Sequence, residues 1–417
     1  MPKSGKRKYS IFGKIYISKT LKIENNNQLR GTVEMRIMVL GCGAMGSGTV
    51  EQLIKYSDAE IIAVDIDIEK PRGLAARLGT DRVTVDSVDV NDYGTLVRKI
   101  KTANPDVVAN SVGPFYLTAG KVYRACIDAG VDCVDICDDP PGTKEALALH
   151  EEAEKAGITI VSGAGDSPGL SNIVVSYCAN RMDRINDVNI YWITPWAFAG
   201  LAQFYHGIHM YAHSHQFING KLVEMKGKVT VEFPSPFGTV ELAYCDHPEP
   251  YTIPIYVQGV KNVRNAGTIW PKPPLPLEDI ANISTLITEP MDIKGTKIKA
   301  TEFLVSLLEC MKEKQKKFWE KEKVPYDLGA TRVEIIGEKD ETPREYVFSG
   351  IGQGLGGTSR TLATIAKMLA KKEVKVKGAY APEGCIDPEL FIREFSGGKL
   401  AWKEVPRTSY ITLARIS

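Results

Sequence analysis

The fold of this chain is decided by the stretch Met35-Arg-Ile-Met-Val-Leu-Gly-Cys-Gly-Ala-Met-Gly46, in which an apolar run ends in a glycine-rich turn. The turn has the form G-x-G-x-x-G, which is informative when it closes a strand and opens a helix. Gly41 permits the tight turn, Gly43 lets a pyrophosphate approach the backbone, and Gly46 allows the helix to pack closely on the strand. The free N–H groups at the start of that helix then face the phosphates.

A carboxylate follows the second predicted strand. Asp65 lies about 20 residues after the glycine turn, where a carboxylate accepts hydrogen bonds from the ribose hydroxyls of a dinucleotide. The same charge repels a 2′-phosphate, and Asp65-Ile-Asp67 places two negative charges where an NADP enzyme is expected to carry arginine. Arg72 is the nearby cation that could reverse this preference. We therefore predict NAD as the cofactor in preference to NADP; the alternative is a fortuitous glycine turn.

Strand and helix patterns alternate through the first part of the chain. The predicted strands are Ile37–Leu40, Glu60–Asp65, Val83–Asp86, Val107–Asn110, Cys133–Ile136 and Thr159–Val161. Helices are predicted after Gly46 and at Pro71–Leu78, Tyr93–Thr102, Leu117–Ala129 and Lys144–Ala156. Such repetition is typical of an α/β protein with a doubly wound parallel sheet of the Rossmann kind.

The pattern changes after Asp183. Strand-like stretches beyond it favour a second domain with a mostly antiparallel sheet; they are Asp187–Ile193, Lys228–Phe233, Thr239–Ala243 and Arg332–Ile336. The proline-rich residues 270–276 are predicted to form a loop. From Gly354 a glycine-rich turn leads into a predicted helix, Arg360–Ala370, which we expect to pack back on the first half.

Composition places the chain among ordinary globular proteins, with 417 residues of which 43% are apolar. Residues 1–34 hold eight Lys/Arg against Glu24 and Glu34, a net +6, so the total of +1 leaves −5 for the rest. Because the rest of the chain is mildly acidic and has no clustered basic face, we expect no nucleic-acid partner. The basic stretch lacks the apolar core of a secretory signal. We interpret residues 1–34 as an extension that is disordered or not native, with Met35 as the alternative start.

Two absences exclude further classes of protein. No apolar run reaches the roughly 18 residues that cross a bilayer, so we expect no membrane partner. The eight cysteines are spread along the chain, and the close pair Cys133 and Cys137 has a spacing typical of neither a zinc site nor a redox motif. Reduced, buried thiols and a cytoplasmic location are therefore the expectation.

Three further stretches carry recognisable motifs. Asp106–Phe115 is a strand that ends in a Pro-aromatic turn, and Lys375–Glu383 reads Val-Lys-Gly-Ala-Tyr-Ala-Pro-Glu from its second residue. Val131–Ile136 is followed by Ala156–Leu170, which contains Asp166-Ser-Pro-Gly169. These stretches resemble the saccharopine dehydrogenase family, which includes saccharopine reductases, lysine 6-dehydrogenases and carboxynorspermidine dehydrogenases. The family usually reads Asp-Pro-Gly, so the carboxylate here is displaced by one residue.

The resemblance implies a Rossmann domain, an inserted α/β catalytic and dimerisation domain, and a C-terminal segment that returns to the first. In this chain these are residues 35–170, 171–355 and 356–417. It also implies hydride transfer at a C–N bond, with the Pro-aromatic turn beside the nicotinamide, and we expect a homodimer. The cofactor-binding residues that we predict are Gly41, Gly43, Ala44, Met45, Gly46, Asp65, Ile66, Asp89, Ser111, Val112, Gly113, Pro114 and Phe115.

Histidines cluster near the start of the second domain. If the segment is a helix, His206, His209 and His213 lie on one face. One interpretation is a proton relay or general base titrating near pH 7. A second is a metal site, although no carboxylate or thiolate is adjacent in sequence, and a third is a polar face satisfied by hydrogen bonds. Our prediction names no metal and takes these histidines, with Asp139 and Asp166, as catalytic candidates.

The acidic candidates carry alternatives of their own. Asp138 and Asp139 follow the strand Cys133–Ile136 at the carboxyl edge, where α/β sheets bind ligands. They bind a substrate ammonium, raise the pKa of a neighbouring group, or cap the next helix. Asp166 belongs to the family-like motif, and it or Ser167 alternatively caps the helix that follows.

The chain departs from saccharopine-processing relatives late in the histidine-rich segment. Those relatives carry Arg-Asn there, and this chain has Tyr211-Ala212. Loss of that arginine argues against saccharopine itself and favours an amine or amino-acid-derived substrate with fewer carboxylates. His247 lies in a turn-like segment and receives no assigned role.

Two other functions are alternatives to the main prediction. Asn110–Phe115 also resembles family members proposed as enoyl reductases, which allows an enoyl or carbonyl reductase on the same fold. A non-catalytic dinucleotide sensor would bind NADH without turnover. The main prediction is an NAD-dependent dehydrogenase acting on an amino acid, an opine-like secondary amine or a polyamine.

Overall fold

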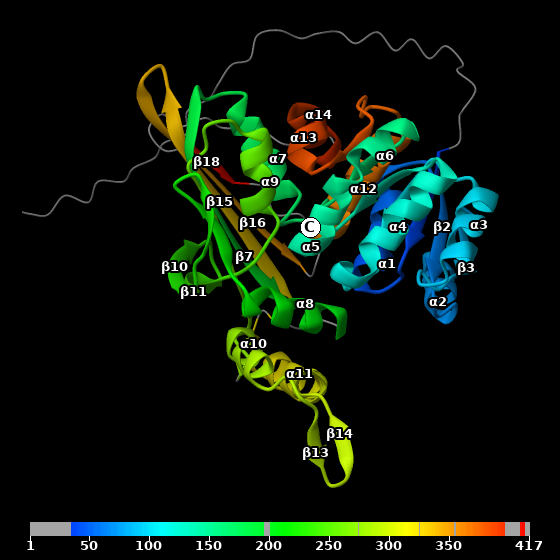
Figure 1. Ribbon diagram of the computed structural model, residues 1–417, viewed down its shortest axis with the longest axis horizontal. Helices are drawn as coiled ribbons and strands as arrows, with labels where there is room; N and C mark the ends of the chain where they lie inside the picture. The colour runs from blue at the N-terminus through cyan, green and yellow to red at the C-terminus, as the bar shows by residue number, and fades with distance from the viewer. Residues whose placement is uncertain are drawn as a thin grey trace, which may run out of the picture. The chain divides into compact units, whose positions relative to one another are not determined.

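Two large β-sheets form the framework of the computed structural model, which describes residues 35–195, 201–273, 275–324, 326–353, 356–396 and 409–412 (Figure 1). The prediction for residues 1–34 lies outside these ranges. The first sheet, as described, has seven parallel strands in the order β17-β6-β5-β4-β1-β2-β3. The strands are β1 (Arg36–Leu40), β2 (Glu60–Asp65), β3 (Val83–Ser87), β4 (Val107–Asn110), β5 (Asp132–Asp135), β6 (Thr159–Val161) and β17 (Gly378–Tyr380). The predicted α/β class with a doubly wound parallel sheet is confirmed.

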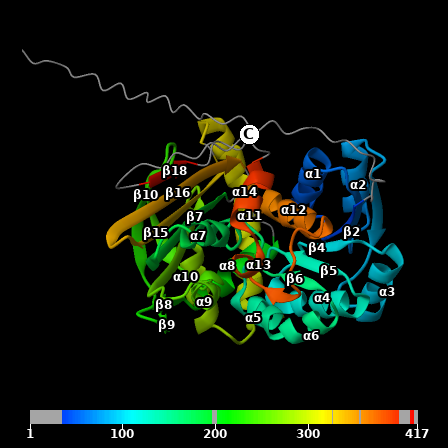
Figure 2. The same cartoon turned by 90° about the horizontal axis from the view of Figure 1, so that it is seen from above.

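Helices cover both faces of this sheet, which is why β4 and β5 are buried throughout. Figure 2 shows α1 and α12 on one side of it and α4, α5 and α6 on the other. The helices in chain order are α1 (Ala44–Tyr56), α2 (Glu69–Leu78), α3 (Tyr93–Ala103), α4 (Phe115–Ala129), α5 (Pro140–Ala148), α6 (His150–Lys155), α7 (Leu170–Ala179) and α12 (Gly356–Ala370).

The single helix predicted at 144–156 is wrong, because the chain forms α5 and α6 with a break at Leu149. The ψ angle of Leu149 is 7°, outside the helical range, and its side chain is buried in the core. At this break the apolar side chain of Leu149 points into the core.

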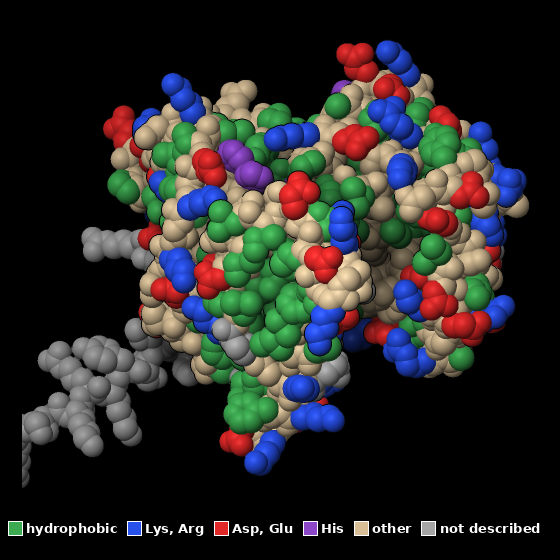
Figure 3. Space-filling view, turned by 60° about the horizontal axis from the view of Figure 1, so that its bottom comes forward, with side chains coloured by type: hydrophobic (Ala, Val, Ile, Leu, Met, Phe, Trp, Pro, Cys, Tyr) green, Lys and Arg blue, Asp and Glu red, His purple; other side chains and the backbone are tan. Residues whose placement is uncertain are grey.

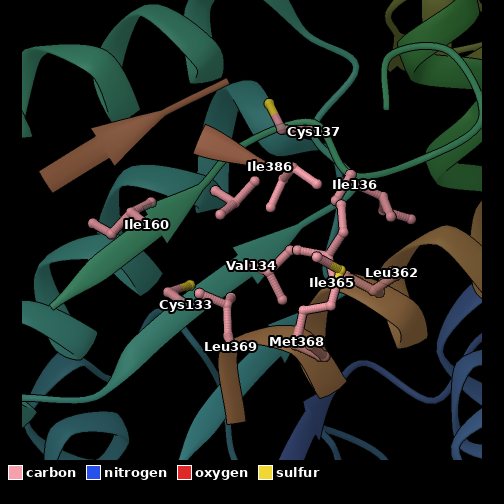
Figure 4. Packing of buried hydrophobic residues seen from close by; sticks show 14 of the residues in the cluster. Cys133, Val134, Ile136, Cys137, Ile160, Leu362, Ile365, Met368, Leu369 and Ile386 are labelled. Atoms are coloured by element: carbon pink, nitrogen blue, oxygen red, sulfur yellow. The ribbon is translucent and has the colours of Figure 1, made fainter. Parts of the chain in front are cut away.

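The predicted helix in the C-terminal segment packs back on the first sheet, as expected. Figure 4 shows Leu362, Ile365, Met368 and Leu369 of α12 beside Val134 of β5. Each fully buried side chain of this size contributes roughly 1.5–3 kcal/mol. Core packing therefore attaches a segment far along the chain to the dinucleotide-binding edge.

The second sheet is mixed. Its strands follow the order β10-β11-β12-β7-β15-β16-β18, with β8 pairing β12 and β9. β12 pairs with β7 and β16 with β18 in parallel, and the other pairs are antiparallel. The strands are β7 (Arg184–Pro195), β8 (His215–Ile218), β9 (Lys221–Glu224), β10 (Lys228–Phe233), β11 (Gly238–Tyr244), β12 (Asn262–Trp270), β15 (Leu328–Lys339), β16 (Thr342–Gln353) and β18 (Ser409–Thr412).

A two-residue turn sets the register of the β15–β16 hairpin. Asp340 and Glu341 both have positive φ, 49° and 58°, as a type I′ turn requires. The strands then pair from end to end, and Thr331 lies opposite Gly350. This register brings both residues to the cavity described below.

Six further helices and a small hairpin complete the described part of the chain. They are α8 (Leu201–Ala212), α9 (Glu249–Tyr256), α10 (Leu277–Leu286), α11 (Ala300–Glu322), α13 (Pro382–Cys385) and α14 (Pro388–Ser396), with the small hairpin β13 (Met291–Ile293) and β14 (Thr296–Ile298). Side chains of α8, α10 and α11 share a hydrophobic core of their own. Among the described helices, none combines the length and apolarity needed to cross a membrane. On the face drawn in Figure 3, acidic and basic side chains are interspersed around a hollow between the two halves.

Glu383 joins the C-terminal segment to α7. Its carboxyl group is buried, and Oε2 accepts a hydrogen bond from Nδ2 of Asn172 at 2.9 Å. Burial raises the pKa of Glu383 from its usual value of 4.5 to about 7. The folded protein therefore holds a proton that the unfolded chain releases at lower pH.

The stability of the fold should consequently fall as this carboxyl group ionises. Because the folded-state pKa is the higher one, the stabilisation is complete below pH 4.5 and is lost as the pH rises through 7. Glu383→Gln keeps an acceptor for Asn172 without the charge. We expect its Tm to match wild type near pH 4 and to exceed it at pH 8, by an amount equivalent to about 3 kcal/mol. An equal Tm difference at both pH values, measured by calorimetry, would contradict this account.

Candidate active site

The glycine turn between β1 and α1 has the shape that a dinucleotide phosphate requires. Gly41 has a φ of 86°, and its N–H donates to the carbonyl oxygen of Val64. A Cβ added to Gly46 would lie 1.6 Å from the carbonyl oxygen of Gly41, whereas one added to Gly43 would meet no atom within 4 Å. Helix α1 has neither an acidic side chain in its first turn nor a side-chain cap. Its free N–H groups and the open space at Gly43 therefore fit a pyrophosphate.

Asp65 lies buried at the end of β2, beside that turn. Its Oδ2 accepts a hydrogen bond from the N–H of Cys42 at 2.7 Å, and its Oδ1 accepts one from the N–H of Asp67 at 3.0 Å. The Nζ of Lys70 lies 3.3 Å from Oδ1. Arg72 instead forms an ion pair within its own helix. The prediction that Arg72 is the one cation near Asp65 is therefore wrong, because Lys70 pairs with the carboxylate.

Unpaired polar atoms lie along the same edge. Ile66 is exposed, and Asp89 is exposed after β3, where its Oδ1 accepts hydrogen bonds from Asn91. The Oγ of Ser111 and the Nδ2 of Asn110 are buried and, within the described residues, have no hydrogen-bond partner. Because buried polar groups are almost always paired, these two atoms fit a site that a ligand completes.

A cavity of about 250 Å³ lies where the loops after β4, β5 and β6 meet the second sheet. Of the predicted cofactor residues, those that line it are Met45, Ser111, Gly113, Pro114 and Phe115. Those that lie outside it, mostly along the edge just described, are Gly41, Gly43, Ala44, Gly46, Asp65, Ile66, Asp89 and Val112. Among its described lining residues there is no lysine or arginine; the acidic and histidine side chains are Asp138, Asp139, Asp166, His206 and His247.

His206 lies between two carboxylates in the cavity wall. Its Nδ1 is 2.8 Å from Oδ1 of Asp139, and its Nε2 is 3.2 Å from Oδ2 of Asp138. The other oxygen of Asp139 accepts the N–H of Tyr116 at 3.2 Å. Asp139 occupies the cap position of α5 but makes no side-chain cap bond. The helix-cap interpretation therefore does not hold for Asp139, whose side chain orients His206 instead.

The two carboxylates change how readily His206 holds its proton. Burial alone lowers its pKa, but the charges of Asp138 and Asp139 and the hydrogen bond to Asp139 outweigh it and raise the pKa to about 9. Burial likewise opposes ionisation of Asp139, yet the charge of His206 lowers the pKa of that carboxyl group. His206 therefore differs from the predicted residue titrating near pH 7.

His247 is held in a second buried network. Its Nδ1 lies 2.6 Å from Oε2 of Glu249, whose Oε1 accepts hydrogen bonds from Ser167 and Ser171. Nδ2 of Asn265 donates to Oγ of Ser167 at 3.2 Å. The side chain of Ser167 therefore donates to Glu249 and does not cap α7, whose cap residue is Gly169.

Asp166 occupies another part of the cavity wall. It is hydrogen-bonded to the hydroxyl of Thr331 on β15, and burial raises the pKa of its carboxyl group. A Cβ added to Gly357 would lie 3.0 Å from Oδ1 of Asp166, so the start of α12 approaches this carboxylate closely. The loop after β6, the second sheet and the C-terminal segment therefore meet at Asp166.

The predicted histidine face fails at His213. Helix α8 ends at Ala212, so His213 lies beyond it, exposed and stacked on His215 with ring centroids 6.4 Å apart. His209 stacks on Tyr116 at 4.7 Å and does not line the cavity. The side of α8 that faces the cavity bears Gln203, His206, Gly207, Met210 and Tyr211.

Several residues of the site escaped the reasoning from sequence. His247 received no role, and Glu249, Asn265 and Trp192 were not candidates, although Trp192 donates from Nε1 to Asn265 at 2.8 Å. No local pattern marks them, because their partners come from distant strands and loops. The motif Asp246-His-Pro-Glu249, with a histidine two residues before an acid, is the one signal that could have been followed.

Comparison with known proteins is consistent with this geometry. Residues 37–161 match the sequence model of the saccharopine dehydrogenase NADP binding domain. A saccharopine dehydrogenase-like oxidoreductase from Mus musculus is 31% identical over 96 residues, 23% of this chain and 22% of that protein. Carboxynorspermidine synthase from Vibrio alginolyticus is 29% identical over 122 residues, 27% of this chain and 29% of that protein. The matched segment thus spans less than a third of either relative.

The fold extends the similarity beyond the matched segment. Apo saccharopine dehydrogenase (L-Glu forming) from Saccharomyces cerevisiae superposes with a TM-score of 0.60 at 13% identity, over 88% of this chain and 98% of that one. The resemblance predicted from the motifs is confirmed: residues 37–161 match the dinucleotide-binding domain of the saccharopine dehydrogenase family in sequence, and the fold of the chain is that of a saccharopine dehydrogenase.

Proposed function

We propose that this protein is an NAD-dependent oxidoreductase that transfers hydride at a C–N bond of an amino acid, an opine-like secondary amine or a polyamine. The observation that carries the proposal is the charge of the cavity. Asp138, Asp139 and Asp166 line it, and the described lining has no lysine or arginine to bind a substrate carboxylate. A protonated amine complements such a wall, because opposite charges attract strongly where water is excluded.

Amine oxidation needs an acceptor for one hydride and an acceptor for one proton. Oxidation of a C–NH group to C=N removes a hydride from carbon and a proton from nitrogen, and bound NAD⁺ takes the hydride. Asp166 is the cavity carboxylate outside the His206 network, and its raised pKa suits a group that accepts a proton. The Thr331 hydroxyl fixes one of its oxygens. We assign Asp166 as the proton acceptor.

The substrate class follows from the same wall. A second carboxylate on the substrate would face Asp138 or Asp166 with no lysine or arginine in the described lining, and the nearby His206 is already paired with Asp138 and Asp139. Like-charge repulsion then costs free energy. Amines with one carboxylate or none are therefore favoured over saccharopine-like dicarboxylates.

The preference for NAD is part of the proposal and rests on Asp65. Lys70 pairs with only one of its oxygens, and the carboxylate still places negative charge next to the ribose position. We expect wild type to bind NADH at least tenfold more tightly than NADPH, a difference of about 1.4 kcal/mol. Asp65→Ser should remove most of this difference. Asp81→Ser, an exposed carboxylate just before β3 at the opposite edge of the sheet, is the control and should retain the difference. Fluorescence titration with both cofactors measures it.

The activity itself is tested on purified protein. NAD⁺ reduction is followed at fixed protein concentration with diamines, lysine, opine-type secondary amines and saccharopine. We expect turnover with amines that carry at most one carboxylate. Turnover confined to enoyl or keto compounds with NADH would replace the proposal by the reductase alternative, and NADH binding without any turnover would favour a sensor.

A further inference from the structure

Two imidazole rings and one carboxylate converge at one point of the cavity wall. Nε2 of His206 lies 3.2 Å from Oδ2 of Asp138. One ligand-type atom each from Asp138, His206 and His247 lie within 4.8 Å of one another. Ligand atoms around a tetrahedral zinc ion are roughly 3.3 Å apart, given Zn–N and Zn–O distances of about 2 Å. Small side-chain adjustments therefore bring all three within reach of one ion.

Each histidine also has a buried carboxylate within hydrogen-bond distance of its Nδ1 nitrogen. Nδ1 of His206 lies 2.8 Å from Asp139, and Nδ1 of His247 lies 2.6 Å from Glu249. The side chains of these acids are 1% and 0% exposed. A carboxylate on the second ring nitrogen is the arrangement that orients metal-ligating histidines. This observation is independent of the convergence, because Asp139 and Glu249 are not among the three converging residues.

We propose that Asp138, His206 and His247 bind a divalent transition-metal ion of the zinc type. Two imidazoles and one carboxylate form a ligand set used by open catalytic sites, in which further coordination positions face the substrate. All three residues line the cavity, so those positions face it here. The site goes beyond the proposed amine oxidation and does not rest on it.

The main alternative to a bound metal ion is a proton held on His206 between the two carboxylates. The same atoms form a hydrogen-bonded Asp138–His206–Asp139 chain when His206 is protonated. That chain accounts for His206 but leaves the convergence of His247 on the same point unexplained. Direct measurement of metal binding separates the two.

The experiment uses untagged full-length protein, stripped with EDTA and titrated with Co²⁺ and then Zn²⁺. We expect one equivalent of Co²⁺ to give the visible absorption of a low-coordinate site and Zn²⁺ to displace it. His247→Ala should abolish this signal. Glu249→Gln, which alters only the orienting carboxylate, should weaken affinity by about 10- to 100-fold.

The controls make each outcome decisive. His213→Ala removes an exposed histidine outside the cavity and should bind Co²⁺ as wild type does. Asp138→Asn preserves side-chain shape, so a loss of binding with an unchanged melting curve supports the site even if His247→Ala unfolds. Lack of stoichiometric binding by wild type, or unchanged affinity in Asp138→Asn and His247→Ala, overturns the proposal. Amine turnover is not the readout, so failure of the proposed function would leave this result intact.

Discussion

Asp166→Asn is expected to lower amine-dependent kcat by a factor of about 10²–10⁴, the usual contribution of a positioned acid or base. Asp166 lines the cavity and is hydrogen-bonded to the hydroxyl of Thr331. An amide of the same shape keeps that contact but cannot accept the proton that leaves the substrate nitrogen. The affinity for NADH should not change, because the glycine turn and Asp65 lie outside the cavity.

The same substitution is expected to preserve or increase thermal stability. Burial raises the pKa of Asp166, so the folded protein disfavours the charged form and an amide removes that cost. Measuring kcat, the Kd for NADH and Tm on one preparation separates loss of chemistry from loss of fold. Asp183→Asn, which replaces an exposed carboxylate on the second domain, serves as the control. Wild-type kcat in Asp166→Asn would remove Asp166 from the mechanism.

Two glycine substitutions in the same turn should fail for different reasons. Gly43→Ala is expected to fold normally, because Gly43 has a φ of −70° and its added Cβ meets no atom within 4 Å. That open space is where a pyrophosphate would lie, so the Kd for NADH should rise at least tenfold, or about 1.4 kcal/mol. Gly46→Ala instead places a Cβ 1.6 Å from the carbonyl oxygen of Gly41.

The second substitution therefore acts on the fold. The clash is with backbone, which cannot move aside as a side chain can, and overpacking of this kind typically costs about 1–3 kcal/mol or more. We expect a lower Tm for Gly46→Ala and weak NADH binding as its consequence. Gly73→Ala, at an open position of α2, should leave NADH binding unchanged and Tm equal or higher. Normal NADH affinity in Gly43→Ala would refute the placement of the phosphates.

Local patterns were enough to predict six of the seven described strands of the first sheet, and the edge strand β17 was missed. The strand at Val107–Asn110 and the helix after Gly46 were predicted because apolar periodicity and glycine placement depend on neighbours in sequence. The break at Leu149 was missed, because a periodic pattern does not show where one buried side chain interrupts a helix.

The histidine segment shows where such reasoning fails. Helical phase placed His206 and His213 on one face, but it could not show that α8 ends at Ala212 or which of its sides meets the cavity. Likewise, Arg72 was the cation expected near Asp65, and Lys70, which lies 3.3 Å from the carboxylate, was overlooked. In both cases the outcome depends on side-chain reach and on where an element stops.

By itself the sequence determined the class of the protein: the turn Gly41–Gly46, the strand ending at Asp65 and the motif around Asp166 are local and carry their meaning in their spacing. Only the tertiary structure decided the site. His206 meets Asp139 across 67 residues, and Ser167 meets Glu249 across 82. Such contacts arise when strands from separate parts of the chain bring their loops to one edge, and burial there, rather than residue type, makes these carboxylates and imidazoles act on one another.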